Sequence, residues 1–234
     1  MGKRNFDLMS RNENTREKVQ RKVVRFEIRQ IRQHFEESLC AIHAQFTVAD
    51  DLWHSGKKEE AENIWRAQII FLASAFDFYM HELTKYGLCE IYEERWNRTE
   101  KYENIQLRMK DIEEALKSGE EIDWFLDYIN GYYQGMTMVS FDAVKEQCNL
   151  LGMSVSEIAD KAFYKRGADE KTKDKLKRRL NELFSRRNII AHQTDRAHED
   201  AQRLEITKEI AAGFIEDVEQ IVQAMEEEAE TKTA

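Results

Sequence analysis

The chain has 234 residues, of which 35% are charged, a formal net charge of −9 at pH 7 and no proline. Because proline breaks helix interiors and is common in the turns of mixed folds, this composition favours long, solvated helices over a sheet-rich fold. No apolar run is long enough to cross a bilayer, and no secretory segment follows the first four residues. We therefore expect a cytoplasmic protein rather than a membrane or secreted one.

Two long helices are expected in the first part of the chain. Apolar residues recur every three to five positions over residues 13–50, which is the periodicity of one long helix. A second helical pattern, over residues 58–96, is apolar enough to be the central core helix. We expect residues 1–56 to form an N-terminal helical arm packed on the core; exchange between subunits and contact with nucleic acid remain alternatives for this arm.

The middle of the chain, about residues 97–152, has a less regular pattern and is interpreted as an insertion. Short helices are expected over residues 105–116 and 124–133, with glycine and serine between and after them. Ser154 and Glu157 have the spacing of a capping box, which predicts a helix from there to about Phe163. A polar connection over residues 165–172 follows.

Two further helices complete the expected fold. The first covers residues 170–193 and carries an apolar stripe that includes Leu176, Leu180 and Leu183. The last begins after Thr207 and leads into an acidic tail, residues 226–234. Since the sequence has no internal repeat and no convincing strand pattern, we predict an all-α bundle.

Charge is unevenly distributed in this acidic chain. Basic residues gather over residues 16–32 and 171–187, whereas the acidic surplus lies over residues 216–230. A local basic surface can therefore coexist with the negative net charge, although solvated helix faces explain most of the individual lysines. Cys40, Cys89 and Cys148 lie far apart without metal-ligand spacing, and we expect them to be reduced thiols in the core.

The most informative stretch is the end of the predicted 170–193 helix, where Arg187, Asn188 and His192 occur together. Arginine is the side chain best shaped to clamp a phosphoryl group. Histidine has the unperturbed pKa that allows proton exchange near neutral pH. This combination suits chemistry at a phosphodiester.

An arginine followed directly by a polar residue, with a histidine after four intervening residues, resembles the motif of the HEPN (higher eukaryotes and prokaryotes nucleotide-binding) ribonucleases. The run over residues 183–196 is similar to the form found in the RiboL-PSP or related bacterial HEPN groups. Residues 66–79 resemble the family's earlier helix, in which a small residue and an aromatic precede an acidic one. The resemblance covers roughly residues 60–225 and implies a HEPN-like antiparallel helical bundle, here over residues 57–230.

The resemblance also implies a reaction and a partner. HEPN ribonucleases place the motifs of two subunits at one cleft, so a homodimer is expected, with RNA as substrate and with neither metal nor cofactor. In this chain, His192 of both subunits would act as acid and base, Arg187 would clamp the phosphate, and Asn188 would orient phosphate or histidine. The products would be a 2′,3′-cyclic phosphate and a 5′-hydroxyl. A toxin or anti-phage defence role is implied, with an antitoxin or regulatory partner.

Two residues are expected to support this site. Asp77 stands where the family's earlier helix often has an acid, and it either holds Arg187 or His192 or pairs elsewhere. Arg186 is either a second phosphate contact or a surface residue. Thr194 stands where HEPN toxins silenced by adenylylation carry a tyrosine, so we expect no such silencing here.

Helix geometry places a condition on the motif. Residues on an α-helix are about 100° apart, so Asn188 and His192 lie about 40° apart, whereas Arg187 and His192 lie about 140° apart. Either the long Arg187 side chain must reach around the helix or the helix must unwind locally.

Two other functions remain open. A non-catalytic HEPN module could bind RNA or a nucleotide, or serve as a regulatory partner. A helical protein-interaction protein could use the acidic tail as its contact, which would leave the motif without a role. Neither alternative requires the composite site, so oligomeric state helps to separate them from the ribonuclease.

Overall fold

The computed structural model describes residues 23–117 and 121–232, and within them the regular structure is helical without strands. The helices are α1 (Ile28–His54), α2 (Lys58–Tyr92), α3 (Glu100–Glu103), α4 (Met109–Lys117), α5 (Glu121–Tyr133), α6 (Phe141–Leu151), α7 (Val155–Phe163), α8 (Thr172–Gln193) and α9 (Lys208–Glu230). The predicted all-α fold is confirmed. No helix in this described part combines the length and the hydropathy that a membrane crossing needs.

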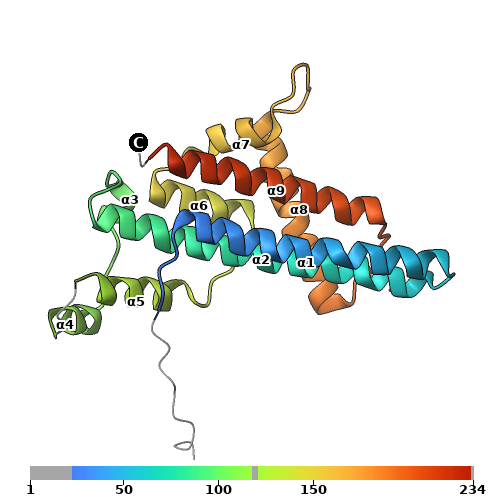
Figure 1. Ribbon diagram of the computed structural model, residues 1–234, viewed down its shortest axis with the longest axis horizontal. Coiled ribbons are helices and arrows are strands. Elements are labelled where there is room, and N and C mark those ends of the chain that lie inside the picture. Colours follow the sequence, from blue (N-terminus) through green and yellow to red (C-terminus); the bar gives the residue numbers. More distant parts are fainter. Residues whose placement is uncertain (1–22, 118–120, 233–234) are drawn as a thin grey trace, which may run out of the picture.

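Helices α1 and α2 form an antiparallel pair along the long axis of the molecule (Figure 1). They pack through apolar positions at helical spacing, and the rings of Phe35 and Tyr79 meet with centroids 5.7 Å apart. Gln68, which is fully buried in α2, donates its amide to the carbonyl of Ile42 at 2.9 Å. Since buried polar groups need such partners, this bond fixes the register of the pair.

Helix α9 covers the same pair from above in Figure 1, α6 packs beside it on α2, and α7 packs on α8 and α9. Its buried stripe includes Val218, Ile221 and Met225, and the Tyr79 hydroxyl donates to the carbonyl of Val222 at 3.4 Å. Residues 226–230 of the expected acidic tail belong to α9. Glu228 accepts a hydrogen bond from the Ser154 amide and pairs with Lys161, each at 3.2 Å.

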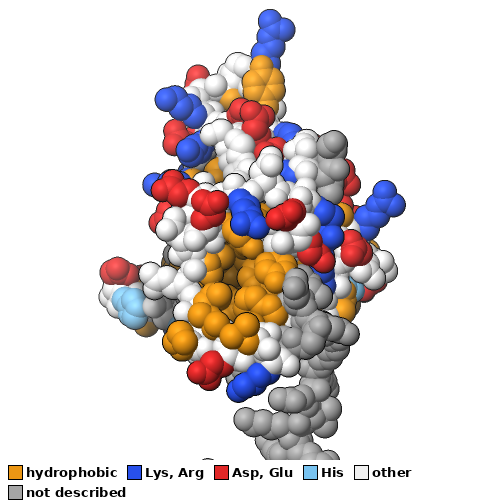
Figure 2. Space-filling view, turned by 90° about the vertical axis from the view of Figure 1, so that its left-hand side faces the viewer, with side chains coloured by type: hydrophobic (Ala, Val, Ile, Leu, Met, Phe, Trp, Pro, Cys, Tyr) orange, Lys and Arg blue, Asp and Glu red, His pale blue; other side chains and the backbone are white. Residues whose placement is uncertain are grey.

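The insertion packs against the C-terminal half of α2. Gly87 permits the close approach of α6, because a Cβ at this position would lie 2.8 Å from side-chain atoms of Leu151 and Trp96. At the end of the molecule formed by α3, α4 and α5, hydrophobic side chains surround a hollow (Figure 2). Tyr92 and Phe125 belong to its lining, and their rings stack with centroids 4.5 Å apart.

The structure refines several expected boundaries. Helix α1 begins at Ile28, although the pattern predicted a start near residue 13; residues 13–22 lie outside the described part. Helix α2 ends at Tyr92 rather than near residue 96, and α6 was not predicted. The Ser154 hydroxyl accepts from the Glu157 amide at 3.2 Å, as the capping signal predicted. Cys89 and Cys148 are buried, but Cys40 is exposed, so its assignment to the core was wrong.

Helix α8 crosses α2 and presents Leu176, Leu180 and Leu183 to the core. Its last turns emerge on the side of the α1–α2 pair opposite to α9 (Figure 1). The sequence motif therefore lies at a helix end that projects beyond the bundle's main layers.

Candidate active site

The motif lies on an uninterrupted helix, because α8 continues through His192 to Gln193. Asn188 and His192 are one turn apart and lie on the same side of the helix. We call the surface formed by Arg187, Asn188 and His192 the motif face. Nη1 of Arg187 donates to Oδ1 of Asn188 at 2.8 Å. Helix α8 does not unwind at the motif, and the Arg187 side chain contacts the adjacent Asn188.

Arg187 is half-buried because it continues the apolar stripe of α8. It follows Leu176, Leu180 and Leu183 at helical spacing, so its methylene groups lie at the edge of the core while its guanidinium turns toward the amide. Other arginines of this helix are neutralised: Arg178 pairs with Glu170, and Arg179 pairs with Asp217. Across the described residues, Arg187 has an amide partner but no carboxylate.

His192 is exposed in the last turn of α8. No hydrogen bond, ion pair or ring contact within residues 23–117 and 121–232 engages its imidazole. One chain therefore presents an unpaired cation and an open imidazole on neighbouring parts of a single helix end. Both groups remain available to a ligand or to a second chain.

A buried cluster of Arg66, Asp195 and Arg186, here the Asp195 cluster, lies next to the motif. Oδ2 of Asp195 accepts from Nε of Arg66 at 2.7 Å and from Nη2 of Arg186 at 2.9 Å. The Asp195 side chain is fully buried. Burial lowers the pKa of Arg186, and the adjacent Asp195 carboxylate opposes this effect. Two arginines thus neutralise and fix one buried carboxylate.

This cluster corrects the expectations for Arg186. Its guanidinium is used by Asp195 and by the carbonyl of Glu205, to which Nη2 donates at 2.7 Å. Arg66 makes a parallel bond to the carbonyl of Leu204 at 3.1 Å. Arg186 is therefore not a simple surface residue; within the described chain it holds the loop after α8.

The chain turns sharply where it leaves α8. Thr194 and Asp195 have φ values of 51° and 60°, and the Asp195 amide donates to the carbonyl of Ile189 at 3.2 Å. Left-handed backbone costs about 1–2 kcal/mol for each non-glycine residue. The strain persists because the buried carboxylate is held from two sides, and this fixes the helix end that carries His192.

Sequence reasoning gave the Asp195 cluster no role. Arg66 opens one of the two segments that resemble the family, and Asp195 lies near the end of the other. Their pairing joins positions 129 residues apart, and helix periodicity carries no information about such contacts. Each segment contains charges of both signs, so charge alone does not single out this pair.

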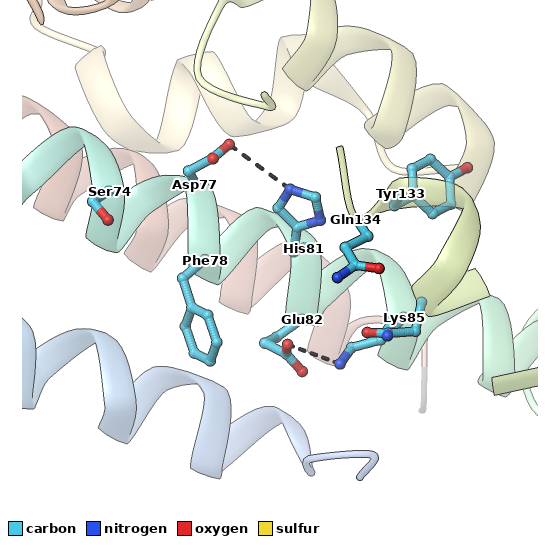
Figure 3. A pocket seen from close by; sticks show the side chains of 9 residues that line it. Ser74, Asp77, Phe78, His81, Glu82, Lys85, Tyr133 and Gln134 are labelled. Atoms are coloured by element: carbon cyan, nitrogen blue, oxygen red, sulfur yellow. Dashed lines mark ion pairs between the residues drawn. The ribbon is translucent and has the colours of Figure 1, made fainter. Parts of the chain in front are cut away.

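Asp77 does not hold the motif within the described chain. Its Oδ1 accepts from the Met138 amide at 2.5 Å and lies 4.0 Å from Nε2 of His81 (Figure 3). Of the two alternatives left open for Asp77, the described chain therefore has the one in which it pairs elsewhere. The physical reason is that the connection between α5 and α6 runs beside α2 and offers its own backbone donor to this carboxylate.

The described residues contain no group of three or more histidine, cysteine or carboxylate side chains arranged to hold a metal ion. The recognisable features of the site are therefore an arginine held by an amide, an open histidine and a buried cluster that fixes the helix end.

Comparison with known proteins identifies a family. The family model of RiboL-PSP-HEPN matches residues 26–231, a span that includes the motif, both partners of the Arg66–Asp195 pair and all of helices α1 to α9. No curated protein and no solved structure gives a significant match to the chain. The chain therefore belongs to the RiboL-PSP-HEPN family.

Proposed function

We propose that this protein is a metal-independent endoribonuclease that cleaves RNA at a composite site formed by two copies of the chain. The observation that carries the proposal is Arg187: its guanidinium is held by Asn188 and lacks a carboxylate partner in the described chain, and an exposed histidine follows five residues later on the same helix. A half-buried cation that is not neutralised internally favours an anionic ligand, and a phosphodiester is an anion that arginine recognises well.

The proposed reaction assigns one task to each group. One His192 takes the proton from the 2′-hydroxyl, whose oxygen then attacks the adjacent phosphorus. The bond from phosphorus to the 5′-oxygen breaks, and a second His192 donates a proton to that leaving oxygen. Arg187 stabilises the charge that develops on the phosphoryl oxygens, while Asn188 orients the guanidinium. The products are a 2′,3′-cyclic phosphate and a 5′-hydroxyl.

A second chain is needed because one chain offers a single histidine on the motif face. The exposed position of His192 at a projecting helix end leaves it accessible to a partner's motif. A homodimer would thus supply both the acid and the base. The proposal therefore requires dimerisation in solution under the conditions of cleavage.

We further propose that the enzyme is a cytoplasmic toxin or anti-phage effector whose activity an antitoxin or another regulatory partner restrains. Family membership supports this role. Thr194 offers no tyrosine for adenylylation, so restraint would use another mechanism, such as occlusion of the motif face.

The test is cleavage of mixed cellular RNA by purified protein in EDTA, with assays for cyclic-phosphate ends and for oligomeric state. His192→Ala should abolish cutting and Arg187→Ala should reduce it by about 10²–10³-fold, while both proteins stay folded. Arg178→Ala and His198→Ala are matched controls, since both residues are exposed and lie outside the motif face; they should cut like the parent. A folded dimeric parent that leaves RNA intact, or cutting that survives His192→Ala, would contradict the proposal.

One observation favours a second candidate, a non-catalytic RNA- or nucleotide-binding or regulatory module. His192 has no group within the described chain that fixes its ring, whereas a catalytic imidazole is usually oriented by a partner. For such a module, the parent would bind RNA without cutting it, and Arg187→Ala would weaken binding more than His192→Ala. The third alternative, a contact protein that uses its acidic tail, is less supported because Glu226 and Glu228 already pair with Arg32 and Lys161.

A further inference from the structure

A second polar site lies on α2, apart from the motif face. A cavity of about 280 Å³ opens between α2 and the end of α5, and its lining includes the ion pair of Glu82 and Lys85 (Figure 3). This volume is near the lower limit for ligand pockets, which suits one planar ring system better than a larger molecule. Neither family membership nor the proposed reaction gives this cavity a role.

The ion pair in this pocket is incompletely satisfied. Nζ of Lys85 lies 2.8 Å from Oε1 of Glu82, and both side chains are more than nine-tenths buried. Oε2 of Glu82 is buried and has no hydrogen-bond partner within the described chain. A buried carboxylate oxygen without a donor is energetically costly, so the pocket favours a ligand that brings N–H groups to Glu82.

The two side chains together present a donor next to acceptors. The Watson–Crick edge of guanine has the complementary order, with the O6 acceptor beside the N1–H and N2–H donors. Lys85 can donate to O6 while Glu82 accepts from N1–H and N2–H. Adenine, cytosine and uracil each present a different order, and none has one acceptor followed by two donors.

The rest of the lining favours a base over a phosphate. The charges of Glu82 and Lys85 cancel, and Asp77 adds a negative charge to the lining. Phe78 also lines the pocket, and 45% of its surface is exposed. Exposed aromatic rings are the usual stacking surfaces for unpaired bases. Hydrogen bonding, charge and ring surface therefore point to the same ligand class.

Asp77, at one edge of the pocket, lies on the side of α2 that carries Arg66, whereas Glu82 lies about 160° from Arg66 around the helix. Arg66, which holds the end of α8 through Asp195, and Asp77, which lines the pocket, are eleven residues apart. This spacing places them about 20° apart around the helix and about 16 Å apart along it. The segment between α5 and α6 also connects the two regions: His81 donates to the carbonyl of Met136 at 2.9 Å, and the Phe141 amide donates to Oδ1 of Asn181 on α8 at 3.2 Å.

We propose that this pocket binds a guanine base, and that in the RNA substrate this base lies a few nucleotides from the cleaved bond. The second half of the statement rests on the proposed ribonuclease function, whereas binding of guanine to the pocket does not. The chemistry is shared by a free guanine nucleotide and by a guanine within RNA, so the experiment tests both.

Binding is measured by calorimetry in EDTA with the 5′-monophosphates of guanosine, inosine, adenosine, cytidine and uridine. Guanosine monophosphate should bind about tenfold more tightly than the adenosine, cytidine and uridine nucleotides. Inosine monophosphate keeps O6 and N1–H but lacks the 2-amino group, so its affinity should be intermediate. Equal affinities across the series, or no binding at millimolar concentration, would overturn the proposal.

Protein variants locate the binding. Glu82→Gln should reduce the affinity for guanosine monophosphate to that of the other nucleotides. The control, Glu93→Gln, removes a paired carboxylate at the end of α2 outside the pocket and should leave binding unchanged. Phe78→Ala, which leaves the ion pair intact, should weaken all five nucleotides without changing their order. Preserved guanine preference in a folded Glu82→Gln protein would overturn the assignment.

A final experiment maps the positions of cleavage in an RNA of known sequence. Cuts should cluster at a fixed distance from guanines in the parent and lose this relation in Glu82→Gln. Guanosine binding without any RNA cleavage would leave the pocket standing and remove the ribonuclease proposal. Cleavage without base preference and without nucleotide binding would remove the pocket alone.

Discussion

Two adjacent arginines at the end of α8 have different kinds of partner. Arg186 is paired with a fully buried carboxylate in the Asp195 cluster, whereas Arg187 on the motif face is held only by an amide. They are neighbours in sequence and identical in chemistry. The difference shows that the role of an arginine here is decided by whether a carboxylate lies within reach after folding. The Asp195 cluster supplies rigidity, and the motif face keeps its charge for an external partner.

The largest effect is expected from removing the Asp195 carboxylate, which is the partner that distinguishes Arg186 from Arg187. Asp195→Ala removes the carboxylate that Arg66 and Arg186 share; Arg66 keeps Glu62 at 3.2 Å, but Arg186 loses its carboxylate partner, and breaking a buried pair in this way costs about 3–5 kcal/mol of unfolding free energy. Urea denaturation measures this loss. Glu199→Ala, which changes an exposed carboxylate in the same loop, is the control and should have little effect. A stable Asp195→Ala protein would show that the cluster does not hold the helix end.

The two arginines themselves should separate activity from stability. Arg187→Ala should lower the cleavage rate by about 10²–10³-fold, the usual effect of losing one transition-state donor, with little change in unfolding free energy. Arg186→Ala should instead destabilise the fold by about 2–3 kcal/mol, because Asp195 loses one of its two cationic partners. Paired kinetic and denaturation measurements test both statements. Equal effects of the two variants on cleavage rate and on unfolding free energy would contradict these different roles.

A third arginine of α8 provides an intermediate case. Arg179 pairs with Asp217 and also with Glu182, so Asp217→Asn leaves it a carboxylate. Burial raises the pKa of Asp217, although Arg179 opposes the shift. A carboxyl whose folded pKa is raised contributes stability below its unfolded pKa and loses it as pH rises through the folded value. The stability of the parent relative to Asp217→Asn should therefore fall as pH rises from about 4, the ordinary value for aspartate. Thermal melts of both proteins across pH 3–7 measure this; a difference that grows with pH would be the opposite sign.

The smallest expected effect is a difference in reactivity between the buried and the exposed cysteine thiols. Burial raises the pKa of Cys89 to about 11 and that of Cys148 to about 12, whereas Cys40 is exposed. Because the thiolate is the reactive form, only Cys40 should react quickly with a disulfide reagent in the native protein. All three should react after denaturation. Rapid native labelling of Cys148 would indicate local opening between α6 and α2.

The sequence predicted the features that depend on local spacing. The apolar periods located α2, α8 and α9, and the Ser154 signal located the start of α7. It also placed Arg187, Asn188 and His192 on one helix and left two geometries for the arginine. These inferences need only the rotation per residue and the capping preferences of a helix.

Contacts between distant segments were not predictable in the same way. The partner of Asp77 is a backbone amide of the connection between α5 and α6, and the partner of Arg66 is 129 residues away. Cys40 was assigned to the core because its helix is apolar, but its position faces solvent. Such outcomes depend on how helices are arranged in three dimensions, which single-helix periodicity does not specify.

The Arg66–Asp195 pair also has a consequence for the order in which the protein is made. Arg66 leaves the ribosome early and Asp195 late, so the end of α8 can be fixed only after most of the chain has been synthesised. Every incomplete product that stops before residue 195 lacks the clamp on the helix that carries His192. The supported form of this helix end is therefore a property of the nearly complete chain.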